Sequence, residues 1–230
     1  MMTPVLDKGF VRLVGYTVDL VDMESGRTDL EAQIVRAARV SYGAGTKTVR
    51  DDAKLIHYLI DHEHWSPFEM VEFKFHVKAP LFVARQWFRH RTANVNEISG
   101  RYSVLKDEFY IPEQFRLQDT KNKQGSMGSL DALTNSYALD AYSEALAYSY
   151  KAYQALLSAG VAREMARMVL PVSIYTEFYW KQDLRNLLHF IHLRLDNHAQ
   201  SEIRAYAQSI LDLVEPYVPT VIRAWRESHD

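Results

Sequence analysis

The stretch "VEFKFHVKAPLFVARQWFRHR", residues 71–91, contains the two patterns on which the predicted fold depends. Its first eight residues alternate strictly between apolar and polar side chains. A period of two predicts a half-exposed antiparallel strand over residues 71–78. Pro80 suits the first turn of a helix, because its missing N–H would be unpaired there in any case. We therefore predict a helix that carries "LFVARQWFRHR" to residue 91 and ends in a cluster of cations.

The residues before this stretch predict one strand and two helices. Residues 10–20, "FVRLVGYTVDL", are rich in the β-branched and aromatic side chains that strands favour. Thr28 and Glu31 have the spacing of a capping box, and the apolar spacing behind them predicts a helix to about Val40. A second helix is predicted over residues 50–62. "HEHWSPFE" ends it, because a residue that precedes proline avoids helical geometry.

The residues after the stretch predict mostly helices. The pattern from Leu130 to Ser158 is helical, and Gly160 follows as a C-terminal cap. A short helix in "AREMARMVL", a strand over residues 172–180 and helices in "LRNLLHFIHLRL" and "AQSEIRAYAQSILDLVEPY" complete the order. Without repeats or linkers, the fold class is predicted to be α+β: one mostly helical domain over residues 1–230 with a small antiparallel sheet.

Two further segments are interpreted from their composition. The polar residues between about 104 and 127 include "DTKNKQGSMGS" and predict a mobile insertion. The Tyr and Ala stripe of residues 137–157 could pack against a cofactor, but such stripes are usually core or subunit contact. We predict that this stripe is core.

The composition excludes several classes of function. The 230 residues include no cysteine, which excludes disulfides, thiolate metal sites and thiol nucleophiles. The formal net charge of -2 argues against nucleic acid as the main partner. The N-terminal residues do not resemble a secretory signal, and no apolar run approaches the roughly 18 residues of a membrane span. We expect a cytoplasmic protein that does not bind membranes.

The cations at the end of the predicted helix form a candidate phosphate site. Arg85 and Arg89 are four residues apart, and Gln86 and Arg89 are three apart, so each pair lies on one side of a helix. The following loop adds Ser99 and a flexible Gly100. Guanidinium groups match phosphate oxygens bidentately, which favours a phosphate monoester or a pyrophosphate. The alternative is a solvated basic helix end, favoured by the helix dipole.

A second group of cations and imidazoles lies downstream. It consists of Arg163, Arg167, Arg185, His189 and Arg194, followed by Asp196, His198 and Gln200. His189 and His192, like His62 and His64, lack a third ligand at a recognised spacing, so we predict no metal site. Next to Trp65, His62 and His64 could instead line an aromatic pocket.

Seven residues separate Arg89-His90-Arg91 from Ser99, and this spacing matches the "RHR, seven, S" signature of flavin-dependent thymidylate synthases. The chain also resembles that family in "HVKAPLFVARQWFRHRTANVNEISGRYS", "HEHWSPFE" and "LRLDNHAQSEIRAYA", in the same order and at compatible spacings. The resemblance covers nearly the whole chain. It implies a homotetramer with active sites between subunits that binds FAD, dUMP, methylenetetrahydrofolate and NADPH and makes dTMP by reductive methylation.

The resemblance also implies roles for individual residues. Those matched to dUMP binding are Gln86, Arg89, Glu97, Ser99, Gly100, Arg101 and Arg167. Those matched to FAD binding are Ser41, Ser66, Arg89, His90, Arg91, Glu97, Asp183, Arg185 and His189. Some relatives have Asn at the positions of Asp183 and His189, and an amide offers different donors from an acid or an imidazole. His64 resembles the residue beside the flavin ring.

The chemistry of methylation is consistent with these roles. Methylating a uracil ring requires a nucleophilic ring carbon, and this chain has no cysteine that could add to the ring. Activation must then come from a cation that stabilises negative charge on the pyrimidine. By its position in "LRLD", Arg194 matches the family residue that favours ionisation of the ring nitrogen, and we predict that Arg194 and His64 are catalytic. A Ser99 nucleophile is the rival interpretation, but serine needs a neighbouring base, so we assign Ser99 to dUMP binding.

Two other functions remain as alternatives at this point. The first is a different flavoprotein on the same scaffold that acts on another pyrimidine. The second is a non-catalytic nucleotide-binding or RNA-binding protein that uses the Arg-rich loop.

Overall fold

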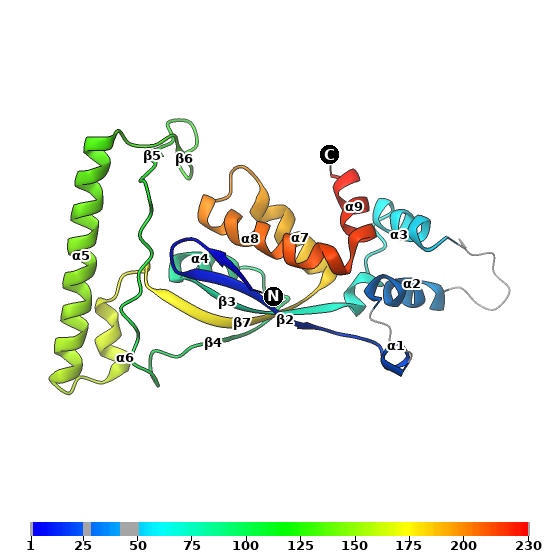
Figure 1. Cartoon of the computed structure of the whole chain (residues 1–230), viewed down its shortest axis with the longest axis horizontal. Helices are drawn as coiled ribbons and strands as arrows, with labels where there is room; N and C mark the ends of the chain where they lie inside the picture. Colours follow the sequence, from blue (N-terminus) through cyan, green and yellow to red (C-terminus); the bar gives the residue numbers. More distant parts are fainter. Residues whose placement is uncertain (1, 25–28, 42–50, 230) are drawn as a thin grey trace.

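A five-stranded antiparallel sheet forms the centre of the protein (Figure 1). The computed structural model describes residues 2–24, 29–41 and 51–229. The strand order is β1-β2-β3-β7-β4, and β3 pairs with β7 along its whole length, from Glu72 opposite Asp183 to Pro80 opposite Tyr175. The strands are β1 (Met2–Val5), β2 (Gly9–Tyr16), β3 (Glu72–Pro80), β7 (Tyr175–Asp183) and β4 (Asn94–Glu97). The α+β fold class is therefore confirmed.

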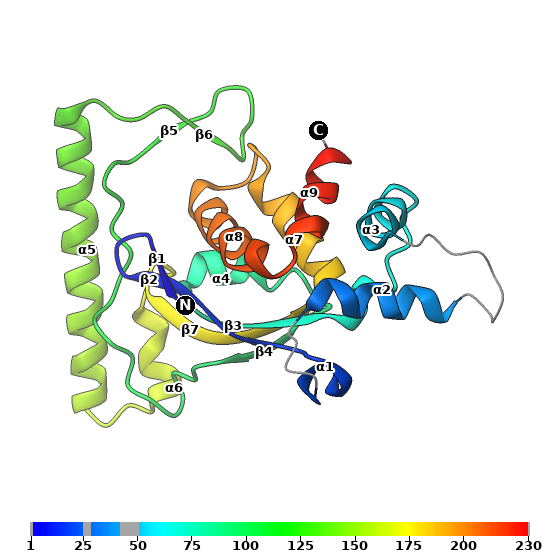
Figure 2. The same ribbon diagram turned by 45° about the vertical axis from the view of Figure 1, so that its right-hand side comes forward.

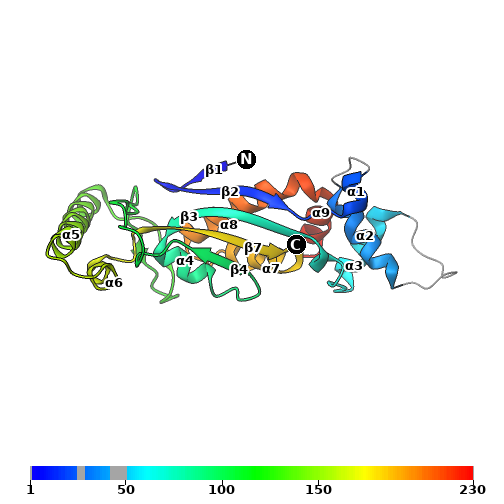
Figure 3. The ribbon, with the colours of Figure 1, turned by 90° about the horizontal axis from the view of Figure 1, so that it is seen from below.

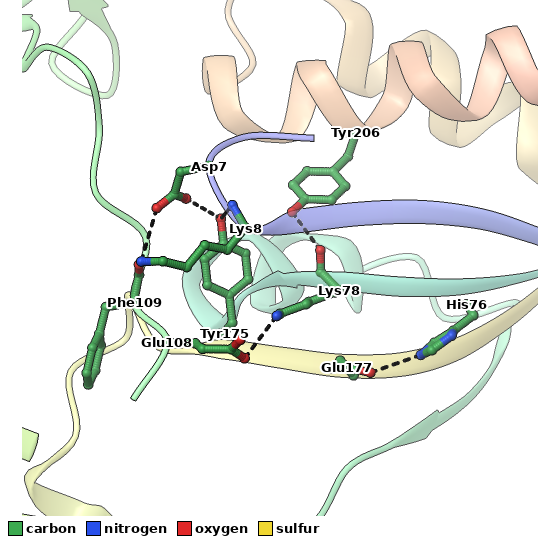
Figure 4. A network of polar contacts seen from close by, with 9 residues as sticks. All are labelled: Asp7, Lys8, His76, Lys78, Glu108, Phe109, Tyr175, Glu177 and Tyr206. Carbon is green, nitrogen blue, oxygen red and sulfur yellow. Dashed lines mark hydrogen bonds and ion pairs between the residues drawn. The ribbon is translucent and has the colours of Figure 1, made fainter. Parts of the chain in front are cut away.

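Strand β3 confirms the alternation in the opening stretch. Phe73, Phe75 and Val77 are completely buried on one face. On the other face Lys78 is only 9% exposed, which differs from the predicted half-exposed strand. The segment that follows β4 covers it, and Lys78 Nζ lies 2.9 Å from the Glu108 carboxylate (Figure 4). A lysine is buried there because its charge has a carboxylate partner.

Helices cover one face of the sheet (Figures 1 and 3). Trp87 lies at the centre of the core between them, with its ring 4.9 Å from that of Phe190 and 5.4 Å from that of Trp180. This packing joins α4, α7 and β7. The helices on this side are α4 (Leu81–Trp87), α7 (Leu184–Leu195), α8 (Ser201–Val214) and α9 (Pro219–Glu227), with short 3-10 turns η1 (Phe68–Met70) and η3 (Glu215–Tyr217).

The N-terminal helices lie beyond one end of the sheet (Figure 1). They are α1 (Leu20–Glu24), α2 (Leu30–Val40) and α3 (Asp52–Asp61), so both helices predicted here are confirmed. The predicted capping box is wrong, because the Asp29 side chain caps α2 by accepting from the Ala32 N–H, 3.0 Å away. Thr28 lies outside the described residues. Glu31 instead accepts from the backbone of α9, at 3.0 Å from the Val221 N–H.

Helix α4 is shorter than predicted. It ends at Trp87, and Arg89, His90 and Arg91 lie in the turns that follow. The next residues form the edge strand β4, which pairs with Phe178–Lys181 of β7. Pairing with the sheet replaces the helix here because Trp87 anchors the last turn in the core and the chain must return to β7.

Helix α5 (Ala132–Ser158) stands at the side of the molecule (Figures 1 and 2). The cap at Gly160 is confirmed: its φ is +82°, and the Val161 N–H reaches the Leu156 carbonyl at 3.0 Å. The predicted burial of the Tyr and Ala stripe is wrong for a single chain. Tyr137 and Tyr148 are 76% and 77% exposed, and only two side chains of the helix are buried.

The segment between β4 and α5 packs along α5. The Tyr150 hydroxyl lies 3.2 Å from the Leu105 carbonyl, and the Tyr142 hydroxyl donates to the Tyr110 carbonyl at 2.8 Å. Beyond Tyr110 the chain forms a small hairpin of β5 (Leu117–Gln118) and β6 (Ser126–Met127), and α5 leads into α6 (Arg163–Ala166) and η2 (Arg167–Val169). None of the helices in the described residues is long and apolar enough to cross a membrane.

Candidate active site

Arg194 is in the last turn of α7 and contacts both α4 and the turn that follows α4. Its Nε donates to His90 Nε2 at 3.0 Å, and its Nη2 donates to the Gln86 carbonyl at 3.1 Å. Burial lowers the pKa of Arg194, which reflects a cation that is partly removed from water. The structure thus brings together Gln86, His90 and Arg194, although Arg194 is more than a hundred residues from the other two.

His90 is a neutral imidazole in this arrangement. Its Nε2 must accept the hydrogen bond, because a guanidinium has only donors. Burial, then the charges of Arg194 and His189, lower the pKa of His90 to about 4. The edge of its ring also contacts Phe190, with 4.9 Å between centroids. At neutral pH, His90 can therefore orient Arg194 without adding a second positive charge.

The free energy of unfolding should fall as the pH is lowered from about 6.5 to about 4. In that window His90 of the unfolded chain binds a proton and folded His90 does not, so acid favours unfolding. We expect a loss on the order of 1–2 kcal/mol, because the ring is only about half buried and solvent screens its interactions. Urea unfolding of the wild type and of His90→Gln at several pH values measures this difference. An identical pH dependence in both proteins would contradict it.

The Gln86 side chain is held by Gln200. Gln86 Nε2 lies 2.6 Å from Gln200 Oε1, although 114 residues separate the two. Gln86 is on α4 and Gln200 directly precedes α8, so this contact joins the ends of two helices. The amide of Gln86 is therefore fixed near Arg194.

A cavity of about 290 Å³ lies beside the first turns of α7. Arg185 and His189 line it, together with the indole rings of Trp65 and Trp225. Arg185 also forms an ion pair with Glu69 at 2.5 Å. Aromatic walls with a guanidinium and an imidazole are suited to a planar ring that carries phosphate.

Asp183 has a structural contact in addition to its predicted role. Its carboxylate caps α7 by accepting from the Asn186 N–H at 3.0 Å and from Asn186 Nδ2 at 2.9 Å. This fixes the start of the helix that carries Arg185, His189 and Arg194.

Arg89 and Arg91 are exposed on the turns after α4. Neither forms an ion pair with any residue that the structure describes. Two cations without a carboxylate partner, beside the neutral His90, create a local positive potential on a chain with net charge -2. Such a turn can bind a pyrophosphate.

A second group of predicted residues surrounds the end of β4. Glu97 accepts from the Thr176 hydroxyl at 2.6 Å, and Ser99 Oγ accepts from the Arg101 N–H at 3.2 Å. Gly100 is buried, and a Cβ there would lie 3.3 Å from Cδ of Arg167. A larger residue at this position would therefore push against the Arg167 side chain.

We call Glu97, Ser99, Gly100, Arg101 and Arg167 the Ser99 group, and Gln86, His90 and Arg194 the Arg194 group. No hydrogen bond or ion pair joins the two groups in the described part of the chain. Arg101 pairs instead with Glu164 of α6, at 3.0 Å. Sequence reasoning missed Glu164 and also Thr176, because neither lies in a motif. Only the structure reveals them, because Glu164 pairs with Arg101 and Thr176 donates to Glu97.

The remaining predicted residues lie apart from both groups. His64 is exposed, with its ring 5.9 Å from Tyr58 and 6.2 Å from His62. Ser66 is exposed before η1, and Ser41 is exposed at the end of α2. No three potential metal ligands gather among residues 2–24, 29–41 and 51–229.

The fold and these contacts define a class of protein. A half-buried guanidinium is held by a neutral imidazole, and the cations on the adjoining turn have no carboxylate partner among the residues that the structure describes. This arrangement suits an enzyme that binds nucleotides and stabilises negative charge on a planar ring. A family model described as "Thymidylate synthase complementing protein" matches residues 20–220.

Similar proteins are known from several organisms. A flavin-dependent thymidylate synthase of Thermus thermophilus is 61% identical over 97% of this chain and 78% of its own length. One from Dictyostelium discoideum is 53% identical over 95% of this chain and 72% of its own length. A crystal structure of the UMP/dUMP methylase PolB from Streptomyces cacaoi, bound with 5-Br UMP, has a TM-score of 0.83 at 29% identity and covers 97% of this chain and 96% of that one. This chain belongs to the family of flavin-dependent thymidylate synthases.

Proposed function

We propose that this protein makes dTMP from dUMP by reductive methylation. Methylenetetrahydrofolate is the carbon donor, FAD the hydride carrier and NADPH the reductant. Bound FAD, once reduced, supplies the hydride that completes the new methyl group. Membership of the family supports this function, and the observation that carries it in this chain is Arg194, a half-buried cation held by His90 in a protein without cysteine.

The residues that are present fit FAD. Arg89 and Arg91, which form no ion pair within the described part of the chain, offer guanidinium groups for its pyrophosphate, and the cavity beside Arg185 and His189 has aromatic walls for a planar ring. The residues that hold FAD are Ser41, Ser66, Arg89, His90, Arg91, Glu97, Asp183, Arg185 and His189. His64 would be the residue beside the flavin ring, where folate and nicotinamide approach.

The dUMP site is built from more than one subunit of a homotetramer. The Ser99 group and the Arg194 group both belong to it, and the lack of a hydrogen bond or ion pair between them in the described part of one chain supports contributions from different subunits. The exposed Tyr side chains of α5 supply an apolar surface for such an assembly. The residues that hold dUMP are Gln86, Arg89, Glu97, Ser99, Gly100, Arg101 and Arg167.

Arg194 activates the pyrimidine electrostatically. A guanidinium that is partly desolvated interacts with a developing negative charge more strongly than one in water. It therefore favours the ionised ring, whose carbon is the better nucleophile. We assign Ser99 to binding and not to nucleophilic attack, since its Oγ accepts from a backbone N–H and is hydrogen-bonded to no base in the described residues.

Replacing Ser99 with alanine should weaken dUMP binding more than turnover. One hydrogen bond of about 1 kcal/mol corresponds to a roughly fivefold increase in KM with little change in kcat. Steady-state kinetics on the FAD-loaded enzyme measure both constants. A complete loss of turnover at saturating dUMP would instead support a Ser99 nucleophile.

Tritium release from dUMP labelled on C5 tests the proposed function. Methylation at C5 releases that hydrogen, so the FAD-loaded protein should release tritium when folate and NADPH are both present. No release with both co-substrates, from a protein that retains FAD, would overturn the proposal.

UMP is a second candidate substrate, because the similar methylase of Streptomyces cacaoi is named for both UMP and dUMP. The same assay with labelled UMP separates the two. Comparable release from both nucleotides would assign the broader specificity.

A further inference from the structure

Thr176 is a buried polar residue near the start of β7. It is 7% exposed, and its side chain lies on the same face of the strand as Phe178 and Trp180, which are both buried. A hydroxyl in such surroundings needs a hydrogen-bond partner. The partner is Glu97, which is 79 residues away in the sequence: Thr176 Oγ1 donates to Glu97 Oε1 at 2.6 Å. A residue of the core is therefore bonded directly to a member of the Ser99 group.

Glu97 is the last residue of the edge strand β4, which lies along β7 (Figure 3). Backbone pairing places Glu97 opposite Phe178, and the next N–H, of Ile98, donates to the Glu177 carbonyl at 2.9 Å. These contacts fix the backbone, but all four residues of β4 are exposed. An exposed glutamate side chain rotates freely, and ordering it when a ligand binds costs free energy. The hydrogen bond from Thr176 orders this side chain beforehand.

Thr176 is suited to hold a carboxylate in one position. Its branched Cβ restricts rotation of the side chain, so the hydroxyl is itself fixed. The hydrogen bond uses Oε1 of Glu97, and Oε2 forms no hydrogen bond or ion pair within the described part of the chain. A carboxylate only accepts hydrogen bonds and repels a phosphate, so Oε2 suits a hydroxyl or an N–H group on the sugar or the base of a nucleotide.

We propose that Thr176 is a positioning residue that orders the carboxylate of Glu97 for dUMP. The inference rests on the proposed function, because Glu97 is a dUMP ligand only there. Thr176 acts through Glu97, since an acceptor that is already in place binds more tightly than one that must first be ordered. Strand β7 thereby contributes to substrate affinity from inside the core.

Two substitutions of Thr176 separate the hydroxyl from the shape of the side chain. Thr176→Val replaces the hydroxyl with a methyl group, and Thr176→Ser keeps the hydroxyl. The full chain, saturated with FAD, is titrated with dUMP by calorimetry. Thr176→Val should weaken dUMP binding roughly fivefold, as expected for one hydrogen bond, while kcat at saturating dUMP changes little. Thr176→Ser should bind dUMP within about twofold of the wild type, because its donor is retained.

A double-mutant cycle tests whether the effect passes through Glu97. Thr176→Val is combined with Glu97→Ala, which removes the carboxylate that Thr176 holds. In this background Thr176→Val should cause no further loss of dUMP affinity. A general effect on packing would instead appear in both backgrounds.

Ser209→Ala is the matched control. Ser209 is 8% exposed, and its hydroxyl donates to the Ala205 carbonyl of its own helix, α8, at 3.0 Å. This variant also loses a buried hydroxyl, but it should bind dUMP like the wild type. A loss of dUMP affinity as large as that of Thr176→Val would overturn the proposal.

Three further results would overturn it: wild-type dUMP affinity in Thr176→Val, equal losses from that substitution with and without Glu97, or a Thr176→Ser variant that binds no better than Thr176→Val. If Thr176→Val does not fold, Thr176→Ala, which removes the hydroxyl without adding a methyl group in its place, should show the same weaker binding. Wild-type affinity there would count against the proposal equally. If the wild type itself does not bind dUMP, the proposed function fails instead.

Discussion

Replacing Arg194 with alanine should reduce turnover of dUMP at least a hundredfold while the protein keeps its FAD. Removal of one positioned donor for a developing anion typically costs two to three orders of magnitude in kcat. The guanidinium is partly buried, and its partners are His90 and the Gln86 carbonyl, so it is rigidly placed before the substrate binds. Turnover is measured by tritium release, and bound FAD by its visible absorbance.

The matched control for this prediction is Arg204→Ala. Arg204 is on α8, and among the described residues its side chain has a single long hydrogen bond, of 3.4 Å, to Asn197, so its removal should leave turnover unchanged. In Arg194→Ala the pKa of His90 should rise somewhat, because a neighbouring cation is gone, although burial is the larger cause of its depression. A variant that loses FAD but keeps its dUMP affinity would contradict the assignment of Arg194 to the pyrimidine.

The parts of the fold that depend on local periodicity were predictable. Strand β3 and helix α5 follow from apolar spacing alone, and Gly160 follows from the need for a positive φ after a helix. Strand β4 was not predictable, because "NVNE" has no burial pattern and all four residues are exposed. Its strand geometry comes from pairing with β7, which is a tertiary contact.

The contacts of the site could not be deduced from periodicity. His90 and Arg194 are 104 residues apart, and only a resemblance to a family placed them in one site. Nothing in the sequence indicates that Glu202 is buried. An acidic residue in the first turn of a helix is expected at the surface, where it complements the helix dipole, and its burial depends on Arg116, which is 86 residues away in the sequence.

The exposure of α5 shows what the apolar spacing of a helix cannot predict. Apolar spacing indicates which face of a helix is buried but not by what. In a single chain Leu133, Tyr137 and Tyr148 remain exposed, although their pattern is that of a buried face. A stripe of this kind predicts contact, and the choice between core and subunit interface requires the arrangement of the other elements.

Replacing Gly9 with alanine should destabilise the protein by roughly 2–4 kcal/mol. A Cβ at this position would lie 2.0 Å from the Tyr206 hydroxyl and 2.7 and 2.8 Å from the carbonyl oxygens of Val5 and Lys78. The two carbonyls belong to strands paired with β2 and cannot move independently, so the hairpin of β1 and β2 must shift. The shift would also break the buried hydrogen bond from Tyr206 to the Lys78 carbonyl, which is 2.7 Å long (Figure 4).

Gly15→Ala is the control in the same strand, because nothing lies within 4 Å of its added Cβ. This variant should be as stable as the wild type or more stable by about 0.4–1 kcal/mol, since alanine restricts the unfolded chain. Urea unfolding followed by far-UV circular dichroism compares the three proteins. Both glycines are in β2 and undergo the same substitution, so the difference in the free energy of unfolding between the two variants isolates the cost of crowding at Tyr206. Equal midpoints for Gly9→Ala and Gly15→Ala would mean that β1 and β2 can separate from α8 without loss, and that the hairpin does not help to hold α8, and with it Gln200, on the sheet.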